Sequence, residues 1–167
     1  MLQNGIGIEK NQEEACRYFK MSANKGYKDA IYEYALMLEK GIGIEMNKKE
    51  ASRYYKMAAD KGHESSMFNY AVMLENGTGI EKNEKEAIRY YKMAIDKGNT
   101  NAMLNYGNML FNGISTSTNT TLDIPEIDFK VTLIIPSSKN KDEVKACHYY
   151  KMAADKGNAD AMDKYGD

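Results

Sequence analysis

The stretch KKEASRYYKMAADKG, residues 48–62, carries the pattern that decides the fold. Its alanines and tyrosines recur three and four residues apart, which is the spacing of one face of an α-helix. Asn47 stands directly before the stretch, and Glu50 lies three residues after Asn47. Gly62 is the last residue of the stretch. An asparagine followed at this distance by a glutamate is a helix-start signal, and a glycine after a lysine is a helix-stop signal. We therefore predict a helix between Asn47 and Gly62.

The same stretch recurs along the chain, with each copy preceded by a start signal. The first three copies are 36 residues apart and the fourth follows 59 residues after the third, so 23 residues are inserted before it. The copies are QEEACRYFKMSANKG (12–26), KKEASRYYKMAADKG (48–62), EKEAIRYYKMAIDKG (84–98) and EVKACHYYKMAADKG (143–157). Asn11 and Asn83 repeat the asparagine cap, whereas the fourth copy has Asp142 as its cap and Lys145 in place of the glutamate. A fixed period of this length predicts a repeat array.

A second helical pattern precedes the later copies and ends at a glycine-rich loop. It reads KDAIYEYALMLEK (28–40), ESSMFNYAVMLEN (64–76) and TNAMLNYGNMLFN (100–112). We name this pattern helix A and the first pattern helix B. The G-I-G-I loops after helix A lack the preceding strand and the following G-K-[ST] of a phosphate-binding loop, so we interpret their glycines as helix stops.

Together the two patterns read A-x-x-x-(Y/L)-(A/G)-x-M-L-x-x-G-x-G-I followed by A-x-x-Y-(Y/F)-K-x-A-x-x-x-G. This unit resembles the Sel-1-like repeat, a relative of the tetratricopeptide repeat. The resemblance implies an all-α fold, an α/α superhelix of antiparallel helix pairs with about four repeats of 36 residues. It also implies that the A helices line a concave face used to assemble protein complexes, and that the repeats share no catalytic residues.

The repeat boundaries predict the domain organisation. Met1 lies 36 residues before Met37, and the final residues stop within a helix A. We therefore predict a single array over residues 1–167, open at both ends and part of a longer protein. An irregular insertion at about 115–139 interrupts it and contains both prolines, with an alternating segment at 129–135 that is compatible with one strand. The insertion has three interpretations: an excursion of a solenoid loop, a partner-contacting element, or an unspliced intron.

The positions of helix A that vary between copies are the candidate partner-binding residues. Several are large and apolar, and the asparagines are suited to hold a peptide backbone. The alternatives are that some of them pack against a neighbouring helix B, or that the variation is neutral. The candidate residues are Tyr32, Glu33, Leu36, Phe68, Asn69, Val72, Leu104, Asn105 and Asn108.

Composition and residue spacing argue against nucleic-acid binding, membrane insertion, metal binding and catalysis. Lys+Arg 23 against Asp+Glu 24, without a run of like charges, argues against nucleic acid as a partner. The chain contains no apolar run of about 18 residues and its N-terminus does not resemble a signal peptide, so we expect a cytoplasmic protein without direct membrane insertion. Cys16 and Cys147 lie three units apart and are expected to be free thiols, while His63 and His148 are expected at the surface. No spacing predicts a metal site, a cofactor site or a catalytic set.

These observations predict a non-catalytic interaction scaffold or adaptor that binds partner proteins or peptides on the helix A face. The alternative is a regulatory or substrate-docking segment of a larger enzyme such as a protein kinase. A third hypothesis is a hydrolase-like role, because some bacterial Sel-1-like proteins act as enzymes. Those relatives carry a cysteine pair in each repeat, and this chain does not.

Overall fold

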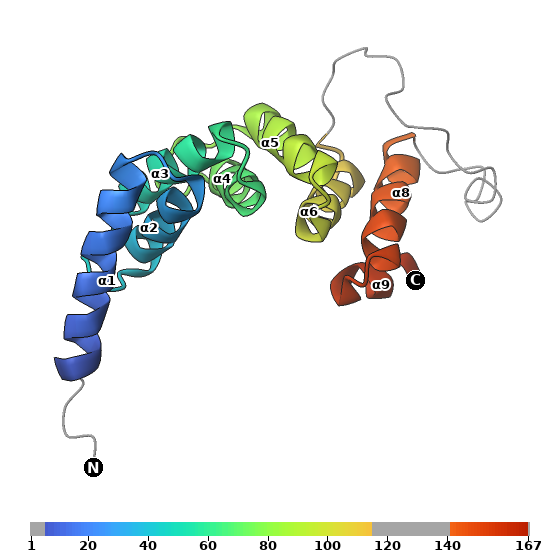
Figure 1. Cartoon of the computed structure of the whole chain (residues 1–167). Coiled ribbons are helices and arrows are strands. Elements are labelled where there is room, and N and C mark those ends of the chain that lie inside the picture. Colours follow the sequence, from blue (N-terminus) through green and yellow to red (C-terminus); the bar gives the residue numbers. More distant parts are fainter. Residues whose placement is uncertain (1–5, 115–140, 167) are drawn as a thin grey trace. The chain divides into compact units, whose positions relative to one another are not determined.

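A computed structural model describes residues 6–114 and 141–166, and every regular element in these ranges is an α-helix (Figure 1). This confirms the predicted all-α architecture of alternating A and B helices. The predicted insertion and its strand lie outside the described residues. The B helices are α1 (Ile6–Asn24), α3 (Lys48–Asp60), α5 (Glu84–Asp96) and α8 (Lys141–Asp155), and the A helices are α2 (Lys28–Lys40), α4 (Glu64–Asn76), α6 (Thr100–Phe111) and α9 (Ala159–Gly166).

The chain divides into two compact units, which we call the N-terminal unit (Met1–Ala94) and the C-terminal unit (Ile95–Asp167). In the N-terminal unit α2 packs against both α1 and α3, and α4 packs against α3. In the C-terminal unit α8 packs against both α6 and α9. Within each unit these helices pack on their neighbours in sequence, which is the packing of a solenoid. None of the helices over residues 6–114 and 141–166 combines the length and the apolar character needed to cross a bilayer.

An edge-to-face tyrosine pair joins helix A to the following helix B in each repeat. Burial of these rings removes apolar surface from water and so stabilises the fold. The edge-to-face geometry places the positive edge of one ring against the negative face of the other. Fully buried alanines on both helix types let the backbones approach closely enough for the rings to meet. The pairs are Tyr34–Tyr54 and Tyr70–Tyr90, each with ring centroids 4.7 Å apart, and Tyr106–Tyr149 at 4.8 Å.

The predicted start signals of helix B are confirmed in the second and third copies. The Asn47 side chain accepts a hydrogen bond from the Glu50 backbone N–H at 2.9 Å, and Asn83 accepts one from the Glu86 N–H at 3.0 Å. The predicted stop is also confirmed, because Gly62 has a φ of +82°. This left-handed conformation is readily adopted by glycine.

The predicted start at Asn11 is wrong, because α1 already begins at Ile6. In the second copy the Asn47 backbone N–H donates to the Leu38 carbonyl of the preceding helix A at 2.8 Å. This bond ties the residue before helix B to helix A. The residue equivalent to Leu38 is Leu2, which lies outside the described residues.

The predicted cap at Asp142 is also wrong, because α8 begins one residue earlier, at Lys141. Asp142 therefore lies in the first turn of the helix. Its carboxylate is 3.5 Å from the Lys145 ammonium, the group that replaces the glutamate of the other copies.

The second glycine of the loop after helix A has a packing role beyond that of a helix stop. Gly43 has a φ of +65°, and a Cβ built on it would lie 2.2 Å from the backbone carbonyl oxygen of Gln12 in α1. Gly79 repeats this arrangement, with a Cβ 2.3 Å from the carbonyl oxygen of Lys48 in α3. The loop therefore rests on the backbone of the preceding helix B, and only a residue without a side chain fits.

Candidate partner-binding surface

Two neighbouring A helices of the N-terminal unit present candidate residues on one side. Successive candidates on each helix are one and three residues apart, so they form a stripe along that helix. All six side chains are half-buried. We call these residues the A-helix face: Tyr32, Glu33 and Leu36 on α2, and Phe68, Asn69 and Val72 on α4.

The aromatic rings of the A-helix face use part of their surface for packing. The Tyr32 ring stacks on His63 with centroids 4.4 Å apart and lies 6.0 Å from the Tyr55 ring of α3. The Phe68 ring lies 6.1 Å from the Tyr91 ring of α5. Each ring is thus held in place by helix B while remaining partly exposed to solvent.

Tyr32 brings the two stripes close to each other. Its ring stacks on His63, the residue that caps α4. Burial raises the pKa of Tyr32, the Glu33 and Glu39 carboxylates raise it further, and the nearby Asn69 and Ser65 side chains of α4 oppose the rise.

A tyrosine–glutamate pair below the A-helix face recurs in consecutive repeats. The Tyr55 hydroxyl donates to the Glu39 carboxylate at 2.6 Å, and the Tyr91 hydroxyl donates to Glu75. Burial raises the pKa of Tyr55, and its hydrogen bond to the Glu39 carboxylate raises it further. Tyr55 therefore stays protonated, and the two hydroxyls hold the Glu39 and Glu75 carboxylates. The sequence contains a signal for this pair, since both residues recur after 36 positions.

The two histidines are half-buried, so each lies at the surface but is partly covered by its neighbours. His63 Nδ1 accepts a hydrogen bond from the Ser66 backbone N–H at 3.2 Å and thereby caps α4. Burial lowers the pKa of His63, Lys28 adds to this effect, and the Asp29 carboxylate 3.7 Å from Nε2 opposes it. Burial likewise lowers the pKa of His148.

The three candidates of the C-terminal unit are used more heavily inside their own unit. Leu104 is buried with 8% of its surface exposed. The Asn108 side-chain oxygen accepts a hydrogen bond from the Tyr150 hydroxyl at 3.0 Å, while Asn105 is half-buried. Phe111 replaces the glutamate of the earlier repeats, so Asn108 takes over as the acceptor for this tyrosine. These residues offer less surface to a partner than the A-helix face does.

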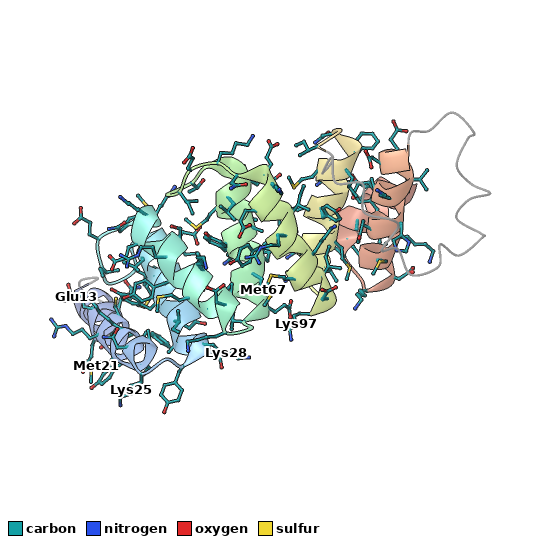
Figure 2. All side chains as sticks on the ribbon, turned by 90° about the horizontal axis from the view of Figure 1, so that it is seen from above. Glu13, Met21, Lys25, Lys28, Met67 and Lys97 are labelled. Atoms are coloured by element: carbon teal, nitrogen blue, oxygen red, sulfur yellow. The ribbon has the colours of Figure 1, made fainter. Side chains whose placement is uncertain are left out.

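A separate apolar surface lies on α1, where Tyr18 is 62% and Met21 is 57% exposed (Figure 2). Tyr18 is the equivalent of Tyr54, which packs edge-to-face on the helix A tyrosine before it. Within the described residues 6–94 of the N-terminal unit, no helix A covers this side of α1.

The remaining candidates are the two cysteines, a hollow beside α1 and possible metal-binding side chains. Cys16 is a buried free thiol, and its burial raises its pKa, while Cys147 is a half-buried free thiol. A shallow hollow of about 390 Å³ lies between α1 and the loop after α2, and its ionisable side chains are Glu13 and Glu45. Among the described residues, no three His, Cys, Asp or Glu side chains are grouped to hold a metal ion.

The family profile of the Sel1 repeat matches residues 1–27, 28–63, 64–99, 100–122 and 138–158. The chain is a Sel1-repeat protein. Four of the matches end three residues after a helix B. The match at 100–122 stops within the predicted insertion, and the match at 138–158 begins near its end. The four repeats predicted from the sequence and the five matches therefore describe the same array, with one repeat split in two. Sel1-repeat proteins generally mediate protein–protein interactions.

Solved structures show the same fold. A Sel1 repeat protein from Oxalobacter formigenes is 24% identical with a TM-score of 0.74, over 93% of this chain and 54% of that one. A protective antigen of uropathogenic Escherichia coli strains with an SLR fold is 19% identical with a TM-score of 0.73, over 90% of this chain and 27% of that one. Helicobacter pylori cysteine rich protein B is 20% identical with a TM-score of 0.51, over 52% of this chain and 65% of that one. This Sel1-repeat protein thus spans about half of the Oxalobacter formigenes protein and about a quarter of the Escherichia coli antigen. No curated protein matches it significantly.

Proposed function

We propose that the chain is a non-catalytic scaffold that binds a partner protein or peptide on the A-helix face of its N-terminal unit. The observation that carries this proposal is the group of apolar side chains that stay partly exposed after packing. Tyr32, Leu36, Phe68 and Val72 form this group on two adjacent helices. Exposed apolar side chains gathered on one face are typical of interaction surfaces.

The contacts beneath the A-helix face favour binding because they hold it in place before a partner arrives. The Tyr32 ring is held by His63, and the Phe68 ring by Tyr91. Side chains ordered in advance lose less conformational entropy on association. Asn69 supplies amide groups between the rings, and such groups pair with a peptide backbone.

Photo-crosslinking in the full chain tests the location of the surface. A benzophenone amino acid replaces Val72 on the A-helix face or, as the control, Met57 on α3, which is 45% exposed. We expect a partner to crosslink through position 72 and not through position 57, because only the first lies on the proposed surface. Equal crosslinking from both positions would argue against this surface.

Substitution of Phe68 tests its contribution once the crosslinked partner is purified. Phe68→Asp is expected to raise the Kd about 30-fold, since loss of a central aromatic anchor costs about 2 kcal/mol or more. Val72→Asp is the second variant, because it leaves the contact between Phe68 and Tyr91 in place. Met57→Asp introduces the same charge on α3 and is expected to leave the Kd unchanged. A folded Phe68→Asp protein that binds like the wild type would contradict the proposal.

A further inference from the structure

We infer that the segment bound by the A-helix face is positively charged; this inference rests on the proposed function and adds the chemistry of the partner. Helices α2, α3 and α4 of the N-terminal unit differ in net charge. The A helices α2 and α4 carry five acidic and two basic side chains, a net charge of −3. Helix α3, which packs between them, carries four basic and two acidic side chains, a net charge of +2. The acidic side chains are Asp29, Glu33, Glu39, Glu64 and Glu75.

Two of these carboxylates flank the apolar stripe of α2. Glu33 adjoins Tyr32, and Glu39 follows Leu36 by one turn. Both carboxylates act on the Tyr32 hydroxyl, where their negative charge contributes to the raised pKa of this group. Glu33 and Glu39 thus lie on either side of Leu36 along α2.

The carboxylate of Glu39 is positioned without being neutralised. The Tyr55 hydroxyl donates to one of its oxygens at 2.6 Å and carries no charge. Over the described part of the chain, neither Glu33 nor Glu39 lies in an ion pair with a basic side chain. A partly buried carboxylate gains from a nearby cation because water screens the pair less than at a fully exposed site.

The next repeat shows that this charge is specific to α2. Asn69 occupies the position equivalent to Glu33, so one carboxylate is absent from α4. Glu75 is equivalent to Glu39. Lys82 follows it, and its ion pair with Glu84 at 2.7 Å raises the pKa of this lysine, with a smaller contribution from Glu75. Met46 stands where Lys82 would be in the earlier repeat. Glu33 is therefore the carboxylate that distinguishes the stripe on α2 from the stripe on α4.

Arginine suits this position better than lysine. Its planar guanidinium can stack on an aromatic ring such as Tyr32 while donating two parallel hydrogen bonds to one carboxylate. An acidic or phosphorylated segment would instead place like charges beside Glu33 and Glu39, and this juxtaposition is unfavourable.

Three fluorescein-labelled peptides of about 12 residues test the inference against the full chain. They share the same leucines and phenylalanines and differ only in carrying arginine, glutamate or serine at the remaining positions. In anisotropy titrations the arginine peptide is expected to bind about tenfold more tightly than the glutamate peptide. This difference should shrink as sodium chloride is raised from about 50 to about 300 mM, because exposed charges are screened.

Two variants locate the charge effect. Glu33→Gln is expected to weaken binding of the arginine peptide about threefold, as expected for one partly exposed ion pair, and to leave the serine peptide unchanged. Glu81→Gln removes an exposed carboxylate from the loop after α4 and is the matched control, with no change expected for either peptide. Equal weakening by both variants would overturn the inference, since the effect would then come from net charge alone.

The outcomes separate the inference from the proposed function. If all three peptides bind equally and Phe68→Asp abolishes their binding, the positive charge of the partner is refuted and the A-helix face stands as the binding surface. If the arginine peptide binds and Phe68→Asp has no effect, both are refuted. If no peptide binds with a Kd below about 1 mM, which corresponds to a binding free energy of about −4 kcal/mol, both are refuted as well.

Discussion

Gly43→Ala tests the contact between the loop after α2 and the helix before it. The residue has a φ of +65°, so a side chain strains the backbone regardless of its surroundings. The new Cβ would also lie 2.2 Å from the Gln12 carbonyl oxygen and 2.6 Å from the Glu13 nitrogen. Both are backbone atoms of α1, and a rotamer change cannot move them away. The loop and α1 would have to separate.

Gly62→Ala separates the two contributions to this loss. Gly62 has a φ of +82°, but no atom lies within 4 Å of the Cβ position. Its substitution therefore costs only the backbone term, about 1–2 kcal/mol in the free energy of unfolding. Gly43→Ala adds an overpacking term of about 1–3 kcal/mol. We expect a total loss of about 2–5 kcal/mol for Gly43→Ala.

Urea denaturation at 25 °C measures both losses. The chain contains no tryptophan, so the far-UV circular dichroism of the helices is the suitable signal. Hydrogen exchange then locates the change, which should appear as faster exchange in α1 and the loop at 41–44 for Gly43→Ala alone. Equal losses of stability in the two variants would refute the close approach of loop and helix.

Three further predictions concern individual contacts. Gly107→Ala would place a Cβ 2.5 Å from the Tyr150 ring, and we expect the resulting overpacking to lower the stability to thermal unfolding by about 1–3 kcal/mol. Tyr55→Phe removes the hydrogen bond to the Glu39 carboxylate and should cost about 1.5 kcal/mol in urea denaturation, whereas an unchanged midpoint would show that this bond contributes nothing. The pKa of His63 is lowered in the folded chain, so the unfolded chain binds protons more readily and stability falls as the pH drops below about 6.5. His63→Asn, which copies the asparagine cap of α6, should reduce this dependence on pH, and an unaltered slope would show that another group causes it.

The sequence allowed the fold to be predicted because the repeat carries local information. The period of 36 residues, the asparagine at 47 and the glycine at 62 each reflect contacts within one helix or turn. The structure agrees with these predictions. The start of α1 was mispredicted because Asn11 and Glu14 match the start signal of the later copies, yet Asn11 lies inside a helix that begins at Ile6.

The candidate site was less predictable because it depends on contacts between helices. His63 follows a glycine turn and suggests a surface residue, yet the Tyr32 ring from the preceding repeat covers it. Variation between copies selected Asn108, whose side chain is held by Tyr150. The sequence did contain a signal for this contact. Phe111 stands where the earlier repeats have Glu39 and Glu75, so Tyr150 lacks the glutamate acceptor of the equivalent tyrosines. Comparison of paired columns would have found this exchange.

The affinity of the A-helix face for the purified, crosslinked partner tests the central claim most directly. Isothermal titration of the wild type, Phe68→Asp and Met57→Asp measures the three dissociation constants under one condition. We predict that Phe68→Asp raises the Kd about 30-fold and that Met57→Asp leaves it within about twofold. Equal dissociation constants for the wild type and a folded Phe68→Asp protein would contradict the claim that this face binds the partner.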